Sequence, residues 1–496
     1  MKERAIEMAC LFVGGWLLVA AGCSSDDGEP GFSPGGSDAS SGKGGAPDAG
    51  GGSGGGGASG GGKGGVDAAP EASPPTAGQE CLSCQPTMQN GMVCPALDRC
   101  STSPLCSAWM TCIKACNTDT CALDCDTKHP DVAPYYFKVY ECLCNSSCAT
   151  RCGSIAICDH KCVDDVALPP MMQPPPTLAE TGLYKGAVGA TQAELAAYAR
   201  PFEPEYVLWS DGALKKRYVY IPKCSQIDTS DVDHWNFPVG TRFWKEFTVV
   251  TANSAGSNVR VETRLIHRFG PGPDDWIFAA YQWDPTVDPQ NPNPTLAKFV
   301  PNGVQNANGT QHDIPSVAQC NNCHTKLKER ILSFSAIQLS HALPGETIKN
   351  LSERGWLSVA AAAGFDPPGD DVAKRALGYL HANCGNCHND AFKPVEPAPL
   401  MRLLVAQKTV ETTDTYTSLV NVRTIATDFA AYDRIEPGKS DLSEIVIRMQ
   451  RRPPATGQMP PLATEIVHTE GVASVVAWIN SLPATGPGLR DSGTRD

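Results

Sequence analysis

The chain has no surplus of basic residues. Its 53 aspartates and glutamates outnumber its 40 lysines and arginines, which leaves a formal net charge of −13 at pH 7. Nucleic acids and anionic lipid surfaces bind proteins through cationic groups. The composition therefore argues against both as partners and fits a protein that meets other proteins through their basic patches.

Long apolar runs are also scarce, and no segment besides residues 9–21 is apolar enough to approach a membrane span. This run is too short to span comfortably, so we interpret residues 1–22 as an export signal. It ends in Ala20-Ala21-Gly22-Cys23, which resembles the lipobox of bacterial lipoproteins, although Ala20 stands where that family usually has leucine. The resemblance implies lipidation of Cys23. Ordinary cleavage nearby and an uncleaved anchor are the alternatives.

Residues 23–79 lack the apolar side chains that a core requires. Gly, Ser, Ala and Asp dominate them, with runs such as residues 54–57. Such a composition cannot bury a core, so we expect a flexible tether that lets the folded body reach away from the membrane.

Two pentapeptides combine paired cysteines with an adjacent histidine: Cys320-Asn321-Asn322-Cys323-His324, the first motif, and Cys384-Gly385-Asn386-Cys387-His388, the second motif. The composition leads to about 0.02 chance matches per chain. This spacing is typical of covalent haem attachment, because two thiols one helical turn apart can each add to a porphyrin vinyl group while the histidine reaches the iron. A zinc-binding or disulfide CxxC is the alternative, but neither motif has a second CxxC at zinc-site distance. We predict two covalent haems, held by Cys320, Cys323, Cys384 and Cys387, with His324 and His388 as iron ligands.

The second motif has the more informative surroundings. Apolar residues that recur from Val372 to Cys384 predict an amphipathic helix leading into it. A second helix, capped by Thr469, is expected to end at Pro483. A Met-Pro loop at residues 457–461 lies between the two helices.

This order of helix, motif, Met-Pro loop and closing helix resembles a class I cytochrome c domain. The resemblance implies an all-α fold and makes Met459 the distal iron ligand. Met449 and Met401 are the alternatives, or are core residues.

The first motif lies too close to the second for an independent class I domain with its own distal loop. His341 is one candidate for the sixth ligand of its iron, His312 and His381 are others, and an open or water-bound position is the remaining possibility. Whether the sixth position of this iron is filled or open decides between electron transfer and catalysis.

Cysteines concentrate in residues 81–162, where 15 of the 22 lie, and Cys224 is the one other cysteine not assigned to the signal, the lipid or haem. These sixteen thiols can pair completely in an oxidising compartment. A metal or an iron–sulfur cluster is the alternative. We interpret the region as a docking or spacer domain.

A repeat within this region spaces cysteines as 112, 116, 121, 125 and again as 148, 152, 158, 162. Cysteines four apart share one helix face, so each unit is expected to form a stapled helical hairpin. Antiparallel helices in the first unit suggest the pairs Cys112–Cys125 and Cys116–Cys121, although the sequence does not fix the connectivity.

From Phe202 to Val300 cysteines almost vanish and β-like runs alternate with turns. The runs cover residues 216–221, 241–250, 259–266 and 276–281. This spacing predicts an antiparallel sandwich or open barrel. We interpret its tryptophans as core rather than a substrate platform and assign no catalytic residue there. His234 and His267 are expected to be surface or hydrogen-bonded side chains.

Segments 178–184, 208–213 and 237–241, followed by both motifs, resemble a bacterial family of diheme c-type cytochromes with a β-rich domain before the haems. The resemblance covers residues 178–482. It implies two covalent haems and an exported location, and it implies no substrate.

Together these patterns predict a multidomain chain. The expected parts are a lipoprotein signal peptide (1–22), a disordered tether (23–79), a disulfide-rich helical module (80–163), a proline-rich linker (164–180), a mainly-β, sandwich-like domain (181–312), a first haem-binding segment (313–369), a class I cytochrome c domain (370–483) and a disordered tail (484–496).

The leading hypothesis is a lipoprotein on the outer membrane, on its periplasmic or cell-surface side, that carries single electrons between redox proteins. One alternative is a haem enzyme, a peroxidase or small-molecule oxidoreductase, with an open first haem. Another is a ligand-binding module in which the haems contribute structure.

Overall fold

A computed structural model describes residues 73–483 except 85–93, 163, 165, 167, 187–190, 251–257, 289–290, 362–363 and 463. The predicted signal peptide, Cys23, nearly all of the tether and the tail at 484–496 lie outside these ranges. Within them, no helix combines the length and apolar character that a membrane span requires.

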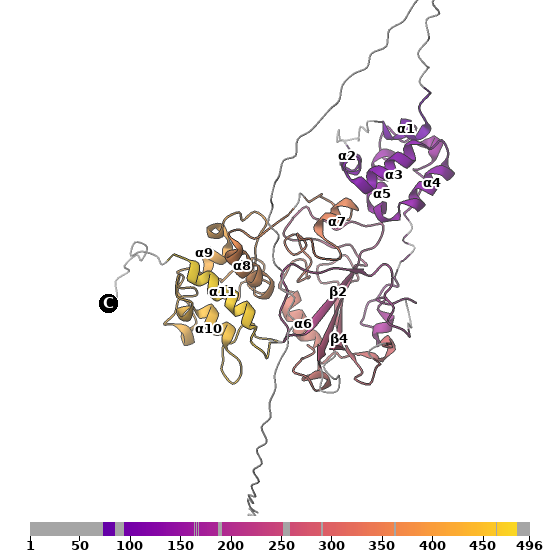
Figure 1. Cartoon of the computed structure of the whole chain (residues 1–496). Helices are drawn as coiled ribbons and strands as arrows, with labels where there is room; N and C mark the ends of the chain where they lie inside the picture. The colour runs from indigo at the N-terminus through magenta and orange to yellow at the C-terminus, as the bar shows by residue number, and fades with distance from the viewer. Residues whose placement is uncertain are drawn as a thin grey trace, which may run out of the picture. The chain divides into compact units, whose positions relative to one another are not determined.

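Five helices form the cysteine-rich region, and Figure 1 shows them gathered together. They are α1 (Ala77–Leu82), α2 (Pro95–Thr102), α3 (Pro104–Lys114), α4 (Asp119–Lys128) and α5 (Ala133–Cys144). The hydroxyl of Ser103 accepts the Cys106 N–H at the start of α3, and Pro104 occupies the first helical position, where its missing N–H costs nothing. Trp109 of α3 is fully buried.

A carboxylate at the centre of these helices binds three side chains. Asp126 accepts hydrogen bonds from the Trp109 indole at 2.9 Å and the Tyr140 hydroxyl at 2.8 Å. His160 places Nδ1 3.0 Å from Asp126 and Nε2 2.7 Å from Asp119. Because both ring nitrogens face carboxylates, the doubly protonated imidazolium fits this position. Hydrogen bonding to Asp126 is the main cause that raises the pKa of His160.

All sixteen cysteines predicted to pair do so. The disulfides are Cys81–Cys152, Cys84–Cys148, Cys94–Cys142, Cys100–Cys106, Cys112–Cys125, Cys116–Cys121, Cys144–Cys158 and Cys162–Cys224. Both pairs suggested for the first repeat unit are confirmed, and α3 and α4 form its stapled hairpin.

The hairpin predicted for the second repeat unit is wrong. After α5 the chain follows turns and one short 3₁₀ turn (Gly153–Ile155), so no helix pair exists there to be stapled. Cys148 and Cys152 instead bond to Cys84 and Cys81, beside and within α1.

The cysteine-rich region is bonded to the part of the chain that follows it. Cys162–Cys224 joins them covalently. Near α7 (Ile348–Glu353), the Tyr135 hydroxyl donates to the Ser352 carbonyl at 2.8 Å. The predicted proline-rich linker is bonded to the β-rich part instead of forming a free connector, because the Phe299 N–H donates to the Pro176 carbonyl at 3.1 Å. The region is therefore docked within its own chain.

One antiparallel sheet occupies the predicted β-rich domain. Its strands, in spatial order, are β1 (Arg200–Pro201), β2 (Leu214–Tyr220), β3 (Arg242–Val250), β4 (Asn258–Arg268), β5 (Trp276–Trp283) and β6 (Ala297–Phe299). The four predicted runs correspond to β2 to β5. The predicted sandwich is not found: all six named strands of the described ranges belong to this sheet, and irregular segments and helices cover its faces.

Alternation along the strands gives the sheet two buried faces. On one face Tyr218, Trp244, Leu265 and Ala279 stand in register and pack with Leu178 and neighbouring residues. On the other face Val219, Phe243, Ile266 and Phe278 form the corresponding row. Helix α6 (Val317–His324), which contains the first motif, lies against β5.

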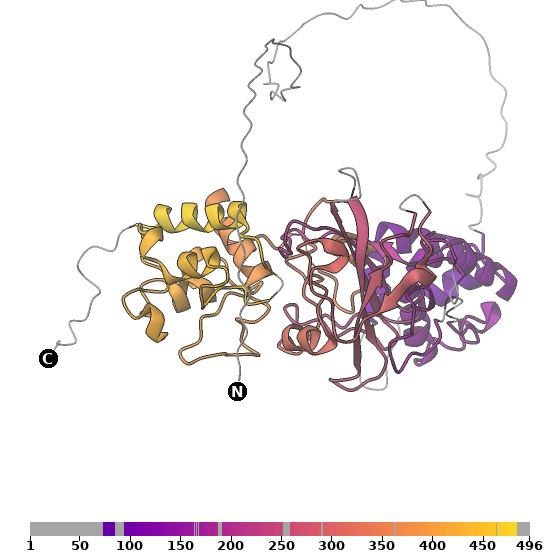
Figure 2. The ribbon, with the colours of Figure 1, turned by 90° about the horizontal axis from the view of Figure 1, so that it is seen from below.

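The C-terminal helices are α8 (Asp371–Asn383), α9 (Asp414–Leu419), α10 (Glu444–Gln450) and α11 (Thr469–Ser481). They gather into one group, coloured orange to yellow in Figure 2. Asp370 caps α8 through the Ala373 N–H at 2.9 Å, and α8 packs against α11. Both predicted helices are present. The predicted cap is wrong by one residue, since His468 takes the N-cap position of α11 and Thr469 begins the helix.

Candidate functional site

Four cysteines of the described ranges remain free, and they are the four of the two motifs. The sixteen disulfide cysteines include several that are as deeply buried as Cys320. Disulfide bonding, and not burial, therefore distinguishes these four free thiols from the structural cysteines.

The first motif occupies the last turns of α6. Ser316 and Gln319 form a capping box, with the Gln319 N–H on the Ser316 hydroxyl at 3.2 Å and the Ser316 N–H on the Gln319 side chain at 2.9 Å. Cys320 and Cys323 follow one turn apart on this fixed helix, and Cys320 is buried.

His324 is held as a neutral imidazole. Its Nδ1–H donates to the Arg330 carbonyl at 2.6 Å, and its ring stacks on Phe278 with centroids 4.7 Å apart. Burial lowers the pKa of His324 to about 4. The hydrogen bond fixes the tautomer that leaves the Nε2 lone pair free, which is the form that metal-ligating histidines take.

The second motif follows the C-terminus of α8. The N–H groups of Cys387 and His388 both donate to the Cys384 carbonyl, at 3.0 and 2.9 Å, so the five residues form a helical turn. His388 Nδ1 donates to the Pro399 carbonyl at 3.1 Å, and burial lowers the pKa of His388. A Cβ on Gly385 would lie 2.7 Å from the His381 carbonyl oxygen, so this turn requires glycine.

The two motifs adjoin each other. The thiols of Cys323 and Cys387 lie near enough to influence each other: the interaction with Cys387 lowers the pKa of Cys323, and the interaction with Cys323 raises the pKa of Cys387. Beyond the motifs, Lys328 pairs with Asp390 at 3.2 Å. Residues 64 positions apart thus form one site, although the sequence offered no sign of the contact.

The buried carboxylate of Glu329 bonds to residues from separate parts of the chain near the two motifs. Glu329, whose side chain is 1% exposed, pairs with Arg402 and accepts from His234 at 3.2 Å. Burial opposes its ionisation, yet Arg402 and His234 hold the pKa of Glu329 below its usual value. Arg402 also donates to the Asp233 carbonyl at 2.9 Å. The prediction for His234 as a hydrogen-bonded histidine is confirmed.

A cavity lies between the first motif and the sheet. Its volume is about 70 Å³, and it opens to solvent. Cys320 and His324 line it together with apolar side chains such as Phe243 and Phe278. Arg217, Lys245 and Arg264 also line it. Sequence reasoning missed these cations, and their inward positions in alternating strands were the available signal.

The candidate sixth ligands of the first haem have other partners. His341 donates from Nε2 to the Glu203 carbonyl at 2.7 Å and accepts the Leu343 N–H at Nδ1 at 3.0 Å. An iron bond from His341 would require one of these hydrogen bonds to break.

The two other histidines are also engaged. Nε2 of His312 lies 2.8 Å from Glu262, and Nδ1 of His381 accepts the Leu403 N–H at 3.1 Å. This arrangement disfavours all three assignments, which stay predictions.

The Met-Pro loop is anchored to α10. The Met459 N–H donates to the Arg448 carbonyl at 3.0 Å, and the Arg448 guanidinium donates to the Gly457 carbonyl at 3.2 Å. Met449 and Met401 are buried in the core of the C-terminal helices, in keeping with core roles. Met459 as an iron ligand stays a prediction.

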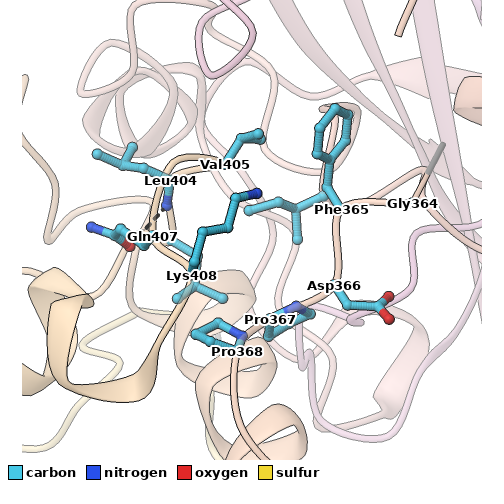
Figure 3. A pocket seen from close by; sticks show the side chains of 11 residues that line it. Gly364, Phe365, Asp366, Pro367, Pro368, Leu404, Val405, Gln407 and Lys408 are labelled. Atoms are coloured by element: carbon cyan, nitrogen blue, oxygen red, sulfur yellow. Dashed lines mark hydrogen bonds between the residues drawn. The ribbon is translucent and has the colours of Figure 1, made fainter. Parts of the chain in front are cut away.

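A second open cavity lies away from both motifs, between residues 364–368 and 403–408 (Figure 3). Figure 3 shows Lys408 extending between the two segments, and the Leu404 N–H donates to Gln407 at 3.1 Å. None of the motif residues lines this cavity, so we assign the site to the first-motif cavity instead.

Comparisons with protein-family models, curated proteins and solved structures find no match for this chain. Its function therefore has to be argued from the site residues themselves.

Proposed function

We propose that this protein is an exported diheme c-type cytochrome that carries single electrons between redox proteins. One observation carries the proposal. In a chain whose other described cysteines are all paired, the four free thiols are those of two CxxCH motifs. A bound c-type haem supplies a one-electron Fe(III)/Fe(II) couple.

The surrounding residues fit this group. Cys320 and Cys323 would hold one haem, and Cys384 and Cys387 the other. Backbone carbonyls orient His324 and His388 so that each offers Nε2 to an iron. The proximity of the two motifs supports transfer within the protein, because both cofactors would be attached at neighbouring thiols.

The C-terminal helices support a class I cytochrome c domain around the second motif. α8 leads into the motif, and α11 packs against α8. The loop that contains Met459 lies between these two helices in the sequence and is anchored by the Met459 N–H. The proposed ligands of the second iron are His388 and Met459, a pair that raises the reduction potential and suits electron transfer.

Eight disulfides support export, since such bonds persist in oxidising compartments. Lipidation at Cys23 and attachment to the outer membrane complete the proposal.

A haem enzyme is the second candidate, and it has an observation of its own. His341, His312 and His381 are all engaged elsewhere, which favours an open sixth position beside the first-motif cavity. An open position would bind small ligands and produce a high-spin ferric spectrum.

The test counts haem per polypeptide on protein matured with a cytochrome c assembly system. We expect two haems for the wild type, and one each for Cys320→Ala/Cys323→Ala and Cys384→Ala/Cys387→Ala. Cys116→Ala/Cys121→Ala, which removes a structural disulfide, serves as the control and should keep two. A wild-type value near zero haem per polypeptide would refute the proposal. The ferric absorption spectrum of the same sample distinguishes the two candidates. Low-spin haems support electron transfer, and a high-spin component supports a haem enzyme with an open site.

A further inference from the structure

Three cations stand side by side on the sheet. Arg217 of β2 pairs in register with Lys245 of β3, which in turn pairs with Arg264 of β4. We call these residues the cation row. Like charges directly opposite each other destabilise a sheet, so the row requires compensation.

At one end of the row a carboxylate forms an ion pair. Arg264 pairs with Glu262 at 2.6 Å, and Glu262 also binds His312. Within the described ranges, no carboxylate forms an ion pair with Lys245, whose ammonium lies 5.0 Å from the centre of the Phe247 ring.

Arg217 forms no ion pair within the described ranges, although the charge of Glu203 partly opposes the effect of burial on its pKa. It is 3% exposed, and its Nε and Nη2 have no hydrogen-bond partner. Burial lowers the pKa of Arg217 to about 10, and burial followed by the charges of neighbouring cations lowers the pKa of Lys245. Unpaired buried cations of this kind are costly, so an anion at this position would relieve a large penalty.

The cation row faces the first-motif cavity. All three of its residues line that cavity with Cys320 and His324. One step along the strands, on the same face, lies the apolar row of Val219, Phe243, Ile266 and Phe278. Phe243, Ile266 and Phe278 of this row line the cavity as well, so its wall combines apolar side chains with cations.

We propose that the cation row is a carboxylate site that receives the propionates of the first haem, with the apolar row against its porphyrin. This inference rests on the proposed function, because it needs a haem at Cys320 and Cys323. A haem has the required combination of a large apolar ring and two carboxylates. A free carboxylate-bearing molecule has the same chemistry, and the test separates the two sources.

The test uses the full-length, haem-loaded protein with Arg217→Gln and Lys245→Met. Lys216→Met is the matched control, because Lys216 is an exposed neighbour on the opposite face of β2. Intact mass and haem count first establish attachment in each variant. A redox titration then gives the potential of each haem, and resonance Raman spectra report the propionate modes.

We expect both variants to keep two haems. Their first haem should become harder to reduce, because a propionate without its cation disfavours the added electron. The expected effect is about tenfold in the oxidised-to-reduced ratio at fixed potential, or about 59 mV for one electron. The second haem and the control should not change, and Arg217→Lys should stay close to wild type.

Attached haem with unchanged potentials and propionate modes in both variants would overturn the cation-row proposal while leaving the proposed function intact. A wild type without haem at the first motif would overturn both. Succinate is the probe for the other source. If succinate shifts the wild-type first haem and the variants abolish that shift, the row takes free carboxylates and the propionate assignment is wrong.

Discussion

The thiols of Cys323 and Cys387 belong to different motifs, yet they lie near each other and each shifts the pKa of the other. Two cysteines of one CxxCH motif are normally considered as a pair of their own. Here the second cysteine of one motif has the second cysteine of the other as its neighbour. The two motifs therefore influence each other through these thiols.

Haem-free protein exposed to an oxidant should form a Cys323–Cys387 disulfide, since these thiols lie near each other. Peptide mapping under non-reducing conditions should recover a peptide pair that joins the two motifs. Haem-loaded protein, in which both sulfurs are thioethers, is the control and should not yield it. Recovery of a Cys320–Cys323 bond in its place would contradict this proximity.

Replacing Glu329 should destabilise the protein strongly. Glu329→Ala leaves the buried Arg402 guanidinium without its carboxylate, which costs roughly 3–5 kcal/mol in the free energy of unfolding. Glu141→Ala is the matched control, because its pair with Lys138 is half exposed and worth about 0–1 kcal/mol. Urea unfolding of haem-loaded protein measures both. Equal effects of the two substitutions would show that the buried network contributes little.

The cysteine-rich region should lose stability as the pH rises. The folded-state pKa of His160 is raised, chiefly by its hydrogen bond to Asp126, so the protonated imidazole favours the folded state. This contribution is fully present below the ordinary pKa of 6.5 and disappears as the pH rises through the folded-state value. The difference in unfolding free energy between wild type and His160→Gln should therefore shrink as the pH rises above 6.5 and passes through the folded-state pKa of His160. A difference that is constant over this range would refute the assignment.

Gly385→Ala should impair attachment at the second motif. The added Cβ would lie 2.7 Å from the His381 carbonyl oxygen and 2.9 Å from the Arg402 Cα, so the turn that carries Cys387 has to shift. We expect close to one haem per polypeptide, retained at the first motif. Gly153→Ala, with nothing within 4 Å of its new Cβ, is the control. Two haems in both variants would show that the turn tolerates the side chain.

Local patterns in the sequence predicted local structure well. Alternating runs located β2 to β5, and spacing of four along a helix face located both disulfides of the α3–α4 hairpin. Both patterns depend only on residues that are close together in the sequence. The same reasoning failed for Cys148 and Cys152, because their partners lie 64 to 71 residues away and no local spacing encodes that pairing.

The sequence singled out the four free thiols and their adjacent histidines, but it did not predict the residues that surround them. The CxxCH spacing identifies the thiols and histidines because that chemistry needs adjacent residues. The cation row depends on the register of three strands, and a one-residue slip would place its members on the other face. The single sheet in place of a sandwich likewise depends on what covers each face, which strand-length patterns do not specify.

The position of Glu329 limits how the chain can be divided. This carboxylate follows the first motif, yet its partners are His234 from the β-rich part and Arg402 from beyond the second motif. A fragment that begins at residue 370 would carry Arg402 without its counter-ion, and a fragment that ends before it would bury Glu329 with only a histidine. The predicted boundary at residue 370 is therefore crossed by buried ion pairing, and a fragment that keeps both motifs with the partners of Glu329 has to include His234 from the β-rich part.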